Sequence, residues 1–153
     1  MNVVFLDFDG VLNSRRFRAS TSDMIDEKYM VFLDRIVKAT GAKIVLSTSW
    51  RTHWDAVPEK CGEAGREIDR IFGKYDMEII GKTPVLKDRG RAQEIQCWLD
   101  SRPDIERYVI LDDSPFGWGK LSGHLVRTGG LTYGLDAEMA EAAIAILSGS
   151  GSF

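Results

Sequence analysis

The sequence predicts an α/β fold built around a mainly parallel sheet, and three observations lead to this fold class. Residues 3–6 and 108–111 are continuous apolar runs, which are typical of strands covered on both faces. Each run is followed at once by closely spaced aspartates. Between the two runs, apolar residues recur at helical spacing over residues 26–39. Open α/β sheets bind ligands at the carboxyl ends of their strands, which is where these aspartates stand.

Length and composition fit one globular domain. The chain has 153 residues, of which 44% are hydrophobic and 28% are charged, enough for a sizeable core. We expect a single domain over residues 1–147, followed by a flexible Ser/Gly tail over residues 148–153. The net charge of −3 argues against a dominant nucleic-acid-binding surface but leaves room for a local basic patch.

The sequence also bears on location. No apolar run is long enough to cross a membrane, and Asp7 and Asp9 interrupt the amino-terminal run that a signal peptide would need. Cys61 and Cys97 lack the spacing of a metal site. We therefore expect a cytoplasmic protein with reduced thiols and no membrane partner, while the oligomeric state is not indicated.

The first aspartate pair lies in the string Asp7-Phe8-Asp9-Gly10, directly after the first predicted strand. Residues two apart in an extended chain point the same way, so the two carboxylates would repel each other and a Mg²⁺ ion would relieve that repulsion. Gly10 allows a sharp turn at the same point. A turn that merely favours aspartate is the alternative, whereas a calcium loop fits poorly because its further ligands are missing.

Two segments downstream leave alternatives open. Arg15, Arg16 and Arg18 follow the first strand, and they could either meet an anionic substrate or lie in a solvated loop. A second strand, predicted over residues 42–46, runs into the hydroxyl side chains of residues 47–49. Such hydroxyls could contact a substrate or cap a helix.

Shorter patterns predict the remaining elements. Residues 77–80 fit a short strand, which could lie at an edge of the sheet. A basic segment over residues 87–91 leads into a helix whose apolar face recurs over residues 92–99. A last short strand is expected over residues 124–127, and Asp136 can cap a final helix.

In chain order, these motifs resemble those of the haloacid dehalogenase-like (HAD) phosphatase superfamily. The strings Thr48-Ser49-Trp50-Arg51 and Leu111-Asp112-Asp113 sharpen the resemblance to the small HAD domains of Swiss-army-knife RNA repair proteins. The resemblance spans nearly the whole chain. It implies a three-layer Rossmann-like HAD fold with a minimal, C0-type cap, because neither interval that holds a cap in the superfamily is long enough here.

The resemblance also implies catalytic roles. Asp7 would be the nucleophile, and Asp9 would be the general acid and base. A cation at the start of a helix would offset charge between the nucleophile and the phosphate. Arg91 fits this role best and Lys87 is the second choice, although a solvated basic helix start would give the same pattern.

By the same resemblance, a hydroxyl after the second strand would hold the transferring phosphoryl group. Thr48 is the chosen residue, with Ser47 one position before it as the open alternative. Substrate contacts are expected from Ser49, Arg51 and Gly10, which lie beside these motifs.

A Mg²⁺ site is implied by the two acid pairs together. Its predicted ligands are Asp7, Asp9, Asp112 and Asp113, and Asp113 would either bind the ion directly or hold its waters. A chance pair of acids at a strand end is the competing explanation for Asp112 and Asp113.

The predicted activity is a Mg²⁺-dependent phosphomonoesterase that forms an aspartyl-phosphate. The phosphorylated substrate would be a nucleic-acid end, a nucleotide or a small metabolite. The alternative is a catalytically weak HAD-fold binding or regulatory module, against which the intact Asp7, Asp9 and Asp112 speak. A response-regulator receiver is disfavoured, since it would carry its phosphoacceptor on the third strand.

Overall fold

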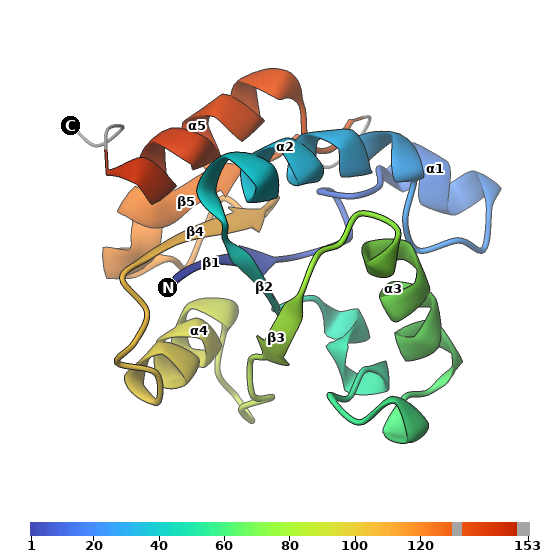
Figure 1. Cartoon of the computed structure of the whole chain (residues 1–153), viewed down its shortest axis with the longest axis horizontal. Helices are drawn as coiled ribbons and strands as arrows, with labels where there is room; N and C mark the ends of the chain where they lie inside the picture. Colours follow the sequence, from blue (N-terminus) through green and yellow to red (C-terminus); the bar gives the residue numbers. More distant parts are fainter. Residues whose placement is uncertain (130–132, 150–153) are drawn as a thin grey trace.

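A five-stranded sheet forms the centre of the computed structural model, which describes residues 1–129 and 133–149. Its strands are Asn2–Leu6 (β1), Lys43–Leu46 (β2), Ile79–Lys82 (β3), Arg107–Asp112 (β4) and Leu125–Arg127 (β5). They lie in the order β3-β2-β1-β4-β5, and each neighbouring pair is parallel (Figure 1). The predicted α/β fold is confirmed, and β3 and β5 are its edges.

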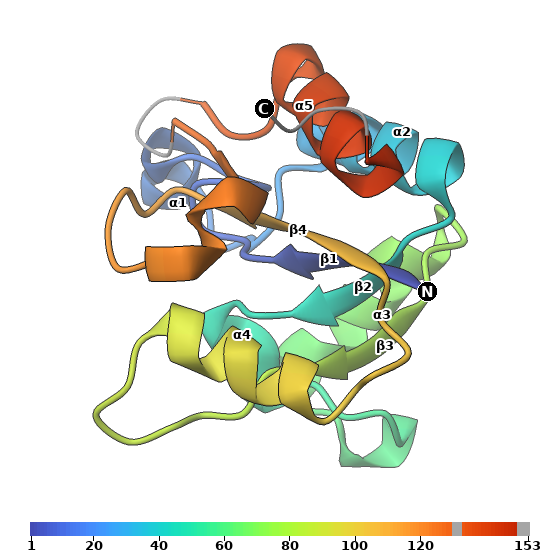
Figure 2. The same ribbon diagram turned by 90° about the vertical axis from the view of Figure 1, so that its left-hand side faces the viewer.

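Side chains of β1 alternate between two cores, one on each face of the sheet. Val4 and Leu6 belong to the core formed with α2 (Met30–Thr40), α3 (Glu63–Gly73) and α5 (Ala137–Ser148). Val3 and Phe5 belong to the core formed with α4 (Arg91–Asp100) and the 3₁₀ helix η4 (Gly119–His124). Figure 2 shows α4 on the near side of the strands and α3 on the far side. Because both faces are covered, residues 3–6 of β1 are all apolar and buried, as the sequence predicts.

Helix ends follow the capping residues in the sequence. The predicted helix over residues 26–39 is observed as a 3₁₀ turn, η1 (Glu27–Tyr29), that continues into α2. Helix α2 stops at Gly41, whose φ of 71° is the left-handed conformation that favours glycine. At the start of α5, the Asp136 carboxylate accepts a 2.8 Å hydrogen bond from the backbone N–H of Met139.

Helix α5 reaches into the predicted tail. It includes Ser148 and ends at Gly149, whereas residues 150–153 lie outside the described residues. None of the helices in the described ranges is long and apolar enough to span a membrane.

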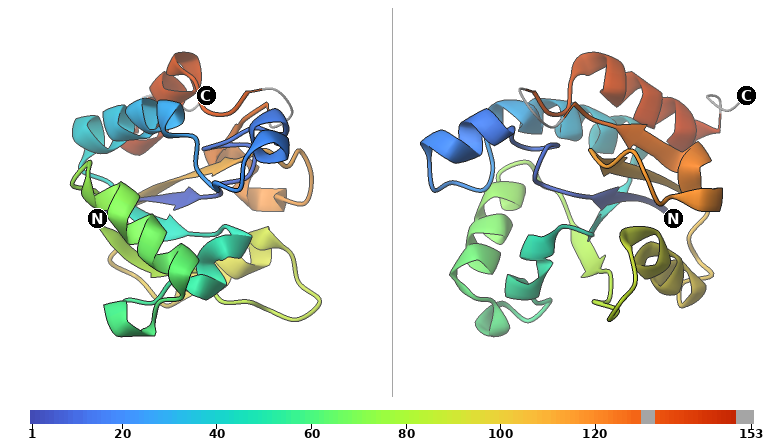
Figure 3. Two further views of the ribbon diagram at one scale, coloured as in Figure 1. Left: turned by 90° about the vertical axis from the view of Figure 1, so that its right-hand side faces the viewer. Right: turned by 180° about the vertical axis from the view of Figure 1, so that it is seen from behind.

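Short helices occupy the two intervals where a cap could have been inserted. Between β1 and α2 lies α1 (Arg15–Ser20), a six-residue helix where a flap or solvated loop was expected. Between β2 and β3, the 3₁₀ helices η2 (Ser49–His53) and η3 (Pro58–Lys60) precede α3. Figure 3 shows η2 between α3 and α4 in both views. Neither interval holds a further domain in the part of the chain that the structure describes, so the site is open.

Sheet register aligns the ends of the three central strands. Leu6 of β1 pairs with Leu46 of β2 and with Leu111 of β4. The residues that follow this aligned row therefore lie at the same level at the carboxyl end of the sheet. They are Asp7, Ser47 and Asp112. Three residues that are far apart in the sequence are brought together by backbone pairing alone.

Candidate active site

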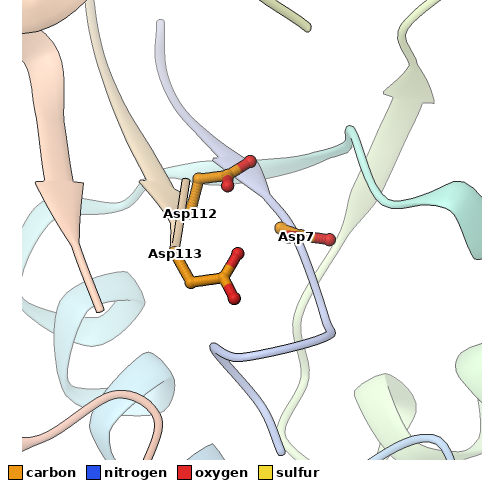
Figure 4. A group of neighbouring side chains, drawn as sticks. All are labelled: Asp7, Asp112 and Asp113. Carbon is orange, nitrogen blue, oxygen red and sulfur yellow. The ribbon is translucent and has the colours of Figure 1, made fainter. Parts of the chain in front are cut away.

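Three carboxylates meet where β1 and β4 end. Asp7, Asp112 and Asp113 each offer one oxygen, and these oxygens lie within 4.8 Å of one another (Figure 4). Asp7 is 2% exposed and Asp112 is fully buried, while Asp113 is half-buried. Three acids from two separate strand ends thus form one cluster, as the register requires.

Arg91 is the cation that faces this cluster. Its Nη1 lies 2.6 Å from Asp7 Oδ2 and 2.7 Å from Asp112 Oδ2. Lys87 is exposed on the loop before α4, whereas Lys82 donates to the carbonyl oxygens of Arg51 and Trp54. The geometry therefore favours Arg91 over Lys87 for the predicted cation.

The cluster carries more negative charge than one arginine offsets. The pKa of Asp7 is raised from 3.8 to about 7. Burial, which disfavours the charged form, is the largest cause of this raised pKa; Arg91 opposes it, and Asp112 and Asp113 add to it. Burial and then Asp112 also raise the pKa of Asp113. Asp7 and Asp112 raise the pKa of Arg91, although its own burial acts in the other direction.

A Mg²⁺ ion fits this donor set. Three carboxylates offer the hard oxygen ligands that the ion prefers, and they converge from two strand ends. Burial and the neighbouring acids raise the pKa of Asp7 and of Asp113, so Arg91 alone does not offset the negative charge of the cluster. The fit rests on Asp7, Asp112 and Asp113.

Asp9 lies apart from the three clustered carboxylates. Its side chain is exposed, accepts a 3.0 Å hydrogen bond from Asn13 Nδ2, and lies 3.8 Å from Arg18 Nε. Among the described residues, the structure does not bring the Asp9 carboxylate into the metal-ligand group that was predicted for it. The turn after Asp7 directs it toward α1, where it can meet a substrate.

Gly10 shapes the acid cluster. Its φ is 83°, and a Cβ at this position would lie 2.2 Å from Asp113 Oδ2. The Gly10 N–H donates to Asn13 Oδ1, and its carbonyl accepts a hydrogen bond from the Thr128 hydroxyl. Gly10 is needed for the close approach of Asp113, besides the substrate contact predicted for it.

The three hydroxyls after β2 differ in what they contact. Thr48 is fully buried, and its hydroxyl accepts a 3.3 Å hydrogen bond from the Trp50 N–H, so it caps η2. Ser47 is level with Asp7, and its buried hydroxyl has no hydrogen-bond partner in the part of the chain that the structure describes. Ser49 is exposed. This arrangement favours Ser47 over the predicted Thr48 as the hydroxyl that serves the nucleophile.

The structure contradicts the predicted substrate contact of Arg51. Its side chain is 7% exposed, its Nη2 lies 3.1 Å from Glu94 Oε1, and its three nitrogens donate to backbone carbonyls. These carbonyls belong to Ser47, Thr48, Thr83 and Pro84. Arg51 thereby ties the end of β2 to the loop after β3 and to α4. It is a structural residue, because its guanidinium has no donor left for a substrate.

A pocket of about 590 Å³ opens above Asp7. Its other lining residues come from the turn after β1, from α1, and from the starts of α4 and the loop after β4: Asp9, Gly10, Asn13, Arg15, Arg18, Ala19, Arg91 and Asp113. Arg15 and Arg18 thus face the pocket, as the anionic-substrate interpretation of this segment requires. Asn13 was not predicted as a site residue, although a short amide near a glycine turn is a recognisable signal.

Comparison with known proteins agrees with this geometry. No curated protein and no solved structure matches the chain. Residues 3–140 match the family described as the HAD domain in Swiss Army Knife RNA repair proteins. This span includes β2 to β5, all of β1 except Asn2, and the three acids of the cluster. The chain therefore belongs to that family of HAD domains.

Proposed function

We propose that this protein is a Mg²⁺-dependent phosphomonoesterase that works through an aspartyl-phosphate on Asp7. The observation that carries the proposal is the position of the Asp7 carboxylate. It lies at the floor of a pocket, beside Asp112 and Asp113, with Arg91 at 2.6 Å. A carboxylate can attack a phosphate only where nearby positive charge offsets the repulsion between them.

The reaction would follow from three side chains. An Asp7 oxygen bonds to phosphorus while the bond from phosphorus to the ester oxygen breaks, and Asp9 gives its proton to that oxygen. Asp9 then takes a proton from the water that attacks phosphorus, which frees Asp7 and releases inorganic phosphate. Arg91 lies beside Asp7 throughout and offsets charge on the phosphoryl oxygens.

Ser47 would assist the same step with its hydroxyl. It follows the neighbouring strand β2 at the level of Asp7, and its hydroxyl forms no hydrogen bond with any residue in the described ranges. We propose that it donates to a phosphoryl oxygen, while Thr48 keeps its capping role.

The metal would be held by Asp7, Asp112 and Asp113, with Asp9 outside the ligand set. When bound, Mg²⁺ supplies positive charge that lowers the barrier to attack on a phosphate dianion. Asp112 is already oriented for this role, because its Oδ1 accepts a 2.9 Å hydrogen bond from the Ser114 N–H.

For the substrate, we propose phosphorylated nucleic-acid ends. The matching family is named for RNA repair proteins, and Arg15 and Arg18 line the pocket. Arg15 and Arg16 are exposed and form no ion pair with the described residues, so both are available to a phosphate backbone. The open site admits a polymer, whereas a small phosphometabolite would need closure from another chain.

Phosphate release tests the proposal. The substrates are oligonucleotides phosphorylated at the 3′ or 5′ end, mononucleotides and sugar phosphates, each with Mg²⁺ or with a chelator. We expect metal-dependent release from oligonucleotide ends and a loss of at least about 10³-fold in Asp7→Asn protein. Release only from the small compounds would move the substrate to metabolites. Near-wild-type turnover by Asp7→Asn would rule out Asp7 as the nucleophile.

A further inference from the structure

A second hollow lies next to the catalytic pocket. This groove, of about 670 Å³, is bounded by the segment before α2, by η2 and by α3. Its size is that of sites that hold small organic molecules. None of the catalytic roles proposed above uses it.

Arg18 separates the groove from the catalytic pocket. Its guanidinium donates to the carbonyl oxygens of Ser22 and Asp23, which line the groove, and lies 5.2 Å from the centre of the Trp50 ring. The same side chain lines the catalytic pocket and lies 3.8 Å from Asp9. The two hollows therefore share one wall.

Asn13 fixes the groove relative to Asp9. Its Nδ2 donates to Asp9 Oδ1 at 3.0 Å and to the Met24 carbonyl, on the groove wall, at 2.7 Å. Asp9 is the residue proposed to protonate the leaving oxygen. A leaving group whose oxygen lies at Asp9 is thus within reach of the groove.

The groove lining has a distinct chemistry. Its apolar part includes the Trp50 indole, with His53 beside it at 6.2 Å between ring centres, and Ile25. Its polar part is rich in carboxylates, among them Asp23 and Glu63. The arginine that lines it, Arg70, is hydrogen-bonded to Glu67. Such a surface repels phosphates and suits a flat, uncharged ring that carries N–H donors.

We propose that this groove binds the terminal nucleobase of the substrate while its phosphate occupies the catalytic pocket. The inference rests on the proposed phosphomonoesterase function and adds a base-binding subsite to it. The ring lies against Trp50, and an exocyclic amino group donates to a rim carboxylate such as Glu63. Bases with an amino group are therefore preferred over uracil, and an abasic end is the poorest substrate.

The test uses phosphorylated oligonucleotides that differ only at the terminal nucleotide, which carries cytosine, uracil or no base. We expect kcat/KM to fall from cytosine to uracil to the abasic end, by about tenfold between the first and the last, the lower range for stacking of a base on an aromatic ring. Equal kcat/KM for the cytosine and abasic ends would overturn the proposal.

Binding to Asp7→Asn protein separates this inference from the proposed function. The same oligonucleotides are titrated with Mg²⁺ present, so the preference for a base is measured without turnover. Tighter binding of the cytosine end, by about tenfold, supports the groove even if the wild type releases no phosphate. Equal binding of the three ends refutes it even if phosphate is released.

A matched pair of charge reversals locates the effect. Glu63→Lys reverses a charge on the groove rim, whereas Glu59→Lys makes the same change at an exposed position of η3 outside the groove. Both side chains are exposed, so neither change disturbs the core. We expect Glu63→Lys to abolish the preference for cytosine over uracil and Glu59→Lys to leave it intact. The same preference in both variants would exclude the groove.

Discussion

Arg51, which contacts helix α4, and Arg91, the first residue of that helix, differ in their surroundings. The Arg51 side chain is 7% exposed and the Arg91 side chain is 32% exposed. Arg51 faces one acid, Glu94, and several carbonyls that use its remaining donors. Arg91 faces Asp7 and Asp112 at the edge of a pocket. An enclosed guanidinium whose donors are all used holds the fold together, whereas one that faces excess negative charge beside a pocket can serve catalysis.

Electrostatics separate the two arginines in the same way. Burial lowers the pKa of Arg51, with Glu94 opposing the shift, whereas the two facing acids raise the pKa of Arg91 against its own burial. Arg51 is thus balanced by one buried partner. Arg91 faces more than one acid, so the net charge around it is negative. Binding of a metal ion or a phosphate would change that net charge.

The largest expected effect is on stability, from Arg51→Ala. This change leaves Glu94 buried without its partner, and we expect the free energy of unfolding to fall by about 3–5 kcal/mol in urea titrations. The control is Arg35→Ala, which removes an exposed arginine 3.9 Å from Glu141 and should cost less than about 1 kcal/mol. Similar losses in both variants would show that Arg51 is not a structural arginine.

The second prediction tests the excess negative charge around Arg91 through the pH dependence of stability. The pKa of Asp7 is raised to about 7 in the folded state and is 3.8 as a reference for the unfolded state. Between these values the folded protein keeps a proton that the unfolded chain has lost, so stability falls as the pH rises from about 4 to about 7. At 1.36 kcal/mol per pKa unit, the loss is about 4 kcal/mol.

Urea unfolding at pH 5 and pH 8 in a chelator measures most of this loss, about 3 kcal/mol, because part of it has already occurred at pH 5. Asp7→Asn protein should lack most of the decrease and should be the more stable of the two at pH 8. Asp100→Asn, which changes an exposed carboxylate, serves as the control. If wild type and Asp7→Asn lose stability in parallel, the pKa of Asp7 is not raised in the folded protein.

The smallest of the three effects is catalytic and comes from Arg91→Ala. We expect kcat to fall by about 10²–10³-fold, because a preorganised charge near the reacting phosphate is lost. The exposed neighbour Arg89→Ala should retain activity. Arg51→Ala, assayed well below its unfolding temperature, should lose less activity than Arg91→Ala. The reverse order would break the distinction between the two arginines.

The fold was largely predictable from local patterns. Apolar strands, helical spacing and the caps Gly41 and Asp136 each act over a few residues, so the sequence reveals them directly. The acids at the ends of β1 and β4 were predictable too, since parallel strands bring their carboxyl ends together. Arg91 was favoured over Lys87 because it stands three residues before Glu94 in the predicted helix, and the structure confirms that α4 begins at Arg91.

Contacts between distant segments were not predictable. The role of Arg51 depends on carbonyls of Thr83 and Pro84 and on Glu94, which are more than thirty positions away along the chain. Ser47 and Thr48 are neighbouring hydroxyl residues that the sequence does not distinguish. The structure shows that Thr48 caps η2, whereas Ser47 lies level with Asp7 because of the sheet register. Glu94, which stands beside the apolar residue Ile95 of the predicted helix, was the available signal in the sequence for a buried partner of Arg51.

The turn that carries Asp9 is completed from the other end of the chain. Thr128 bonds to the carbonyl of Gly10, and the Leu135 N–H donates to the carbonyl of Val11 at 2.8 Å. During synthesis, residues 1–13 leave the ribosome long before these partners exist. Asp7 and Asp9 are therefore synthesised before Thr128 and Leu135, so the turn that carries Asp9 gains these two hydrogen bonds only once Leu135, just before α5, has been added.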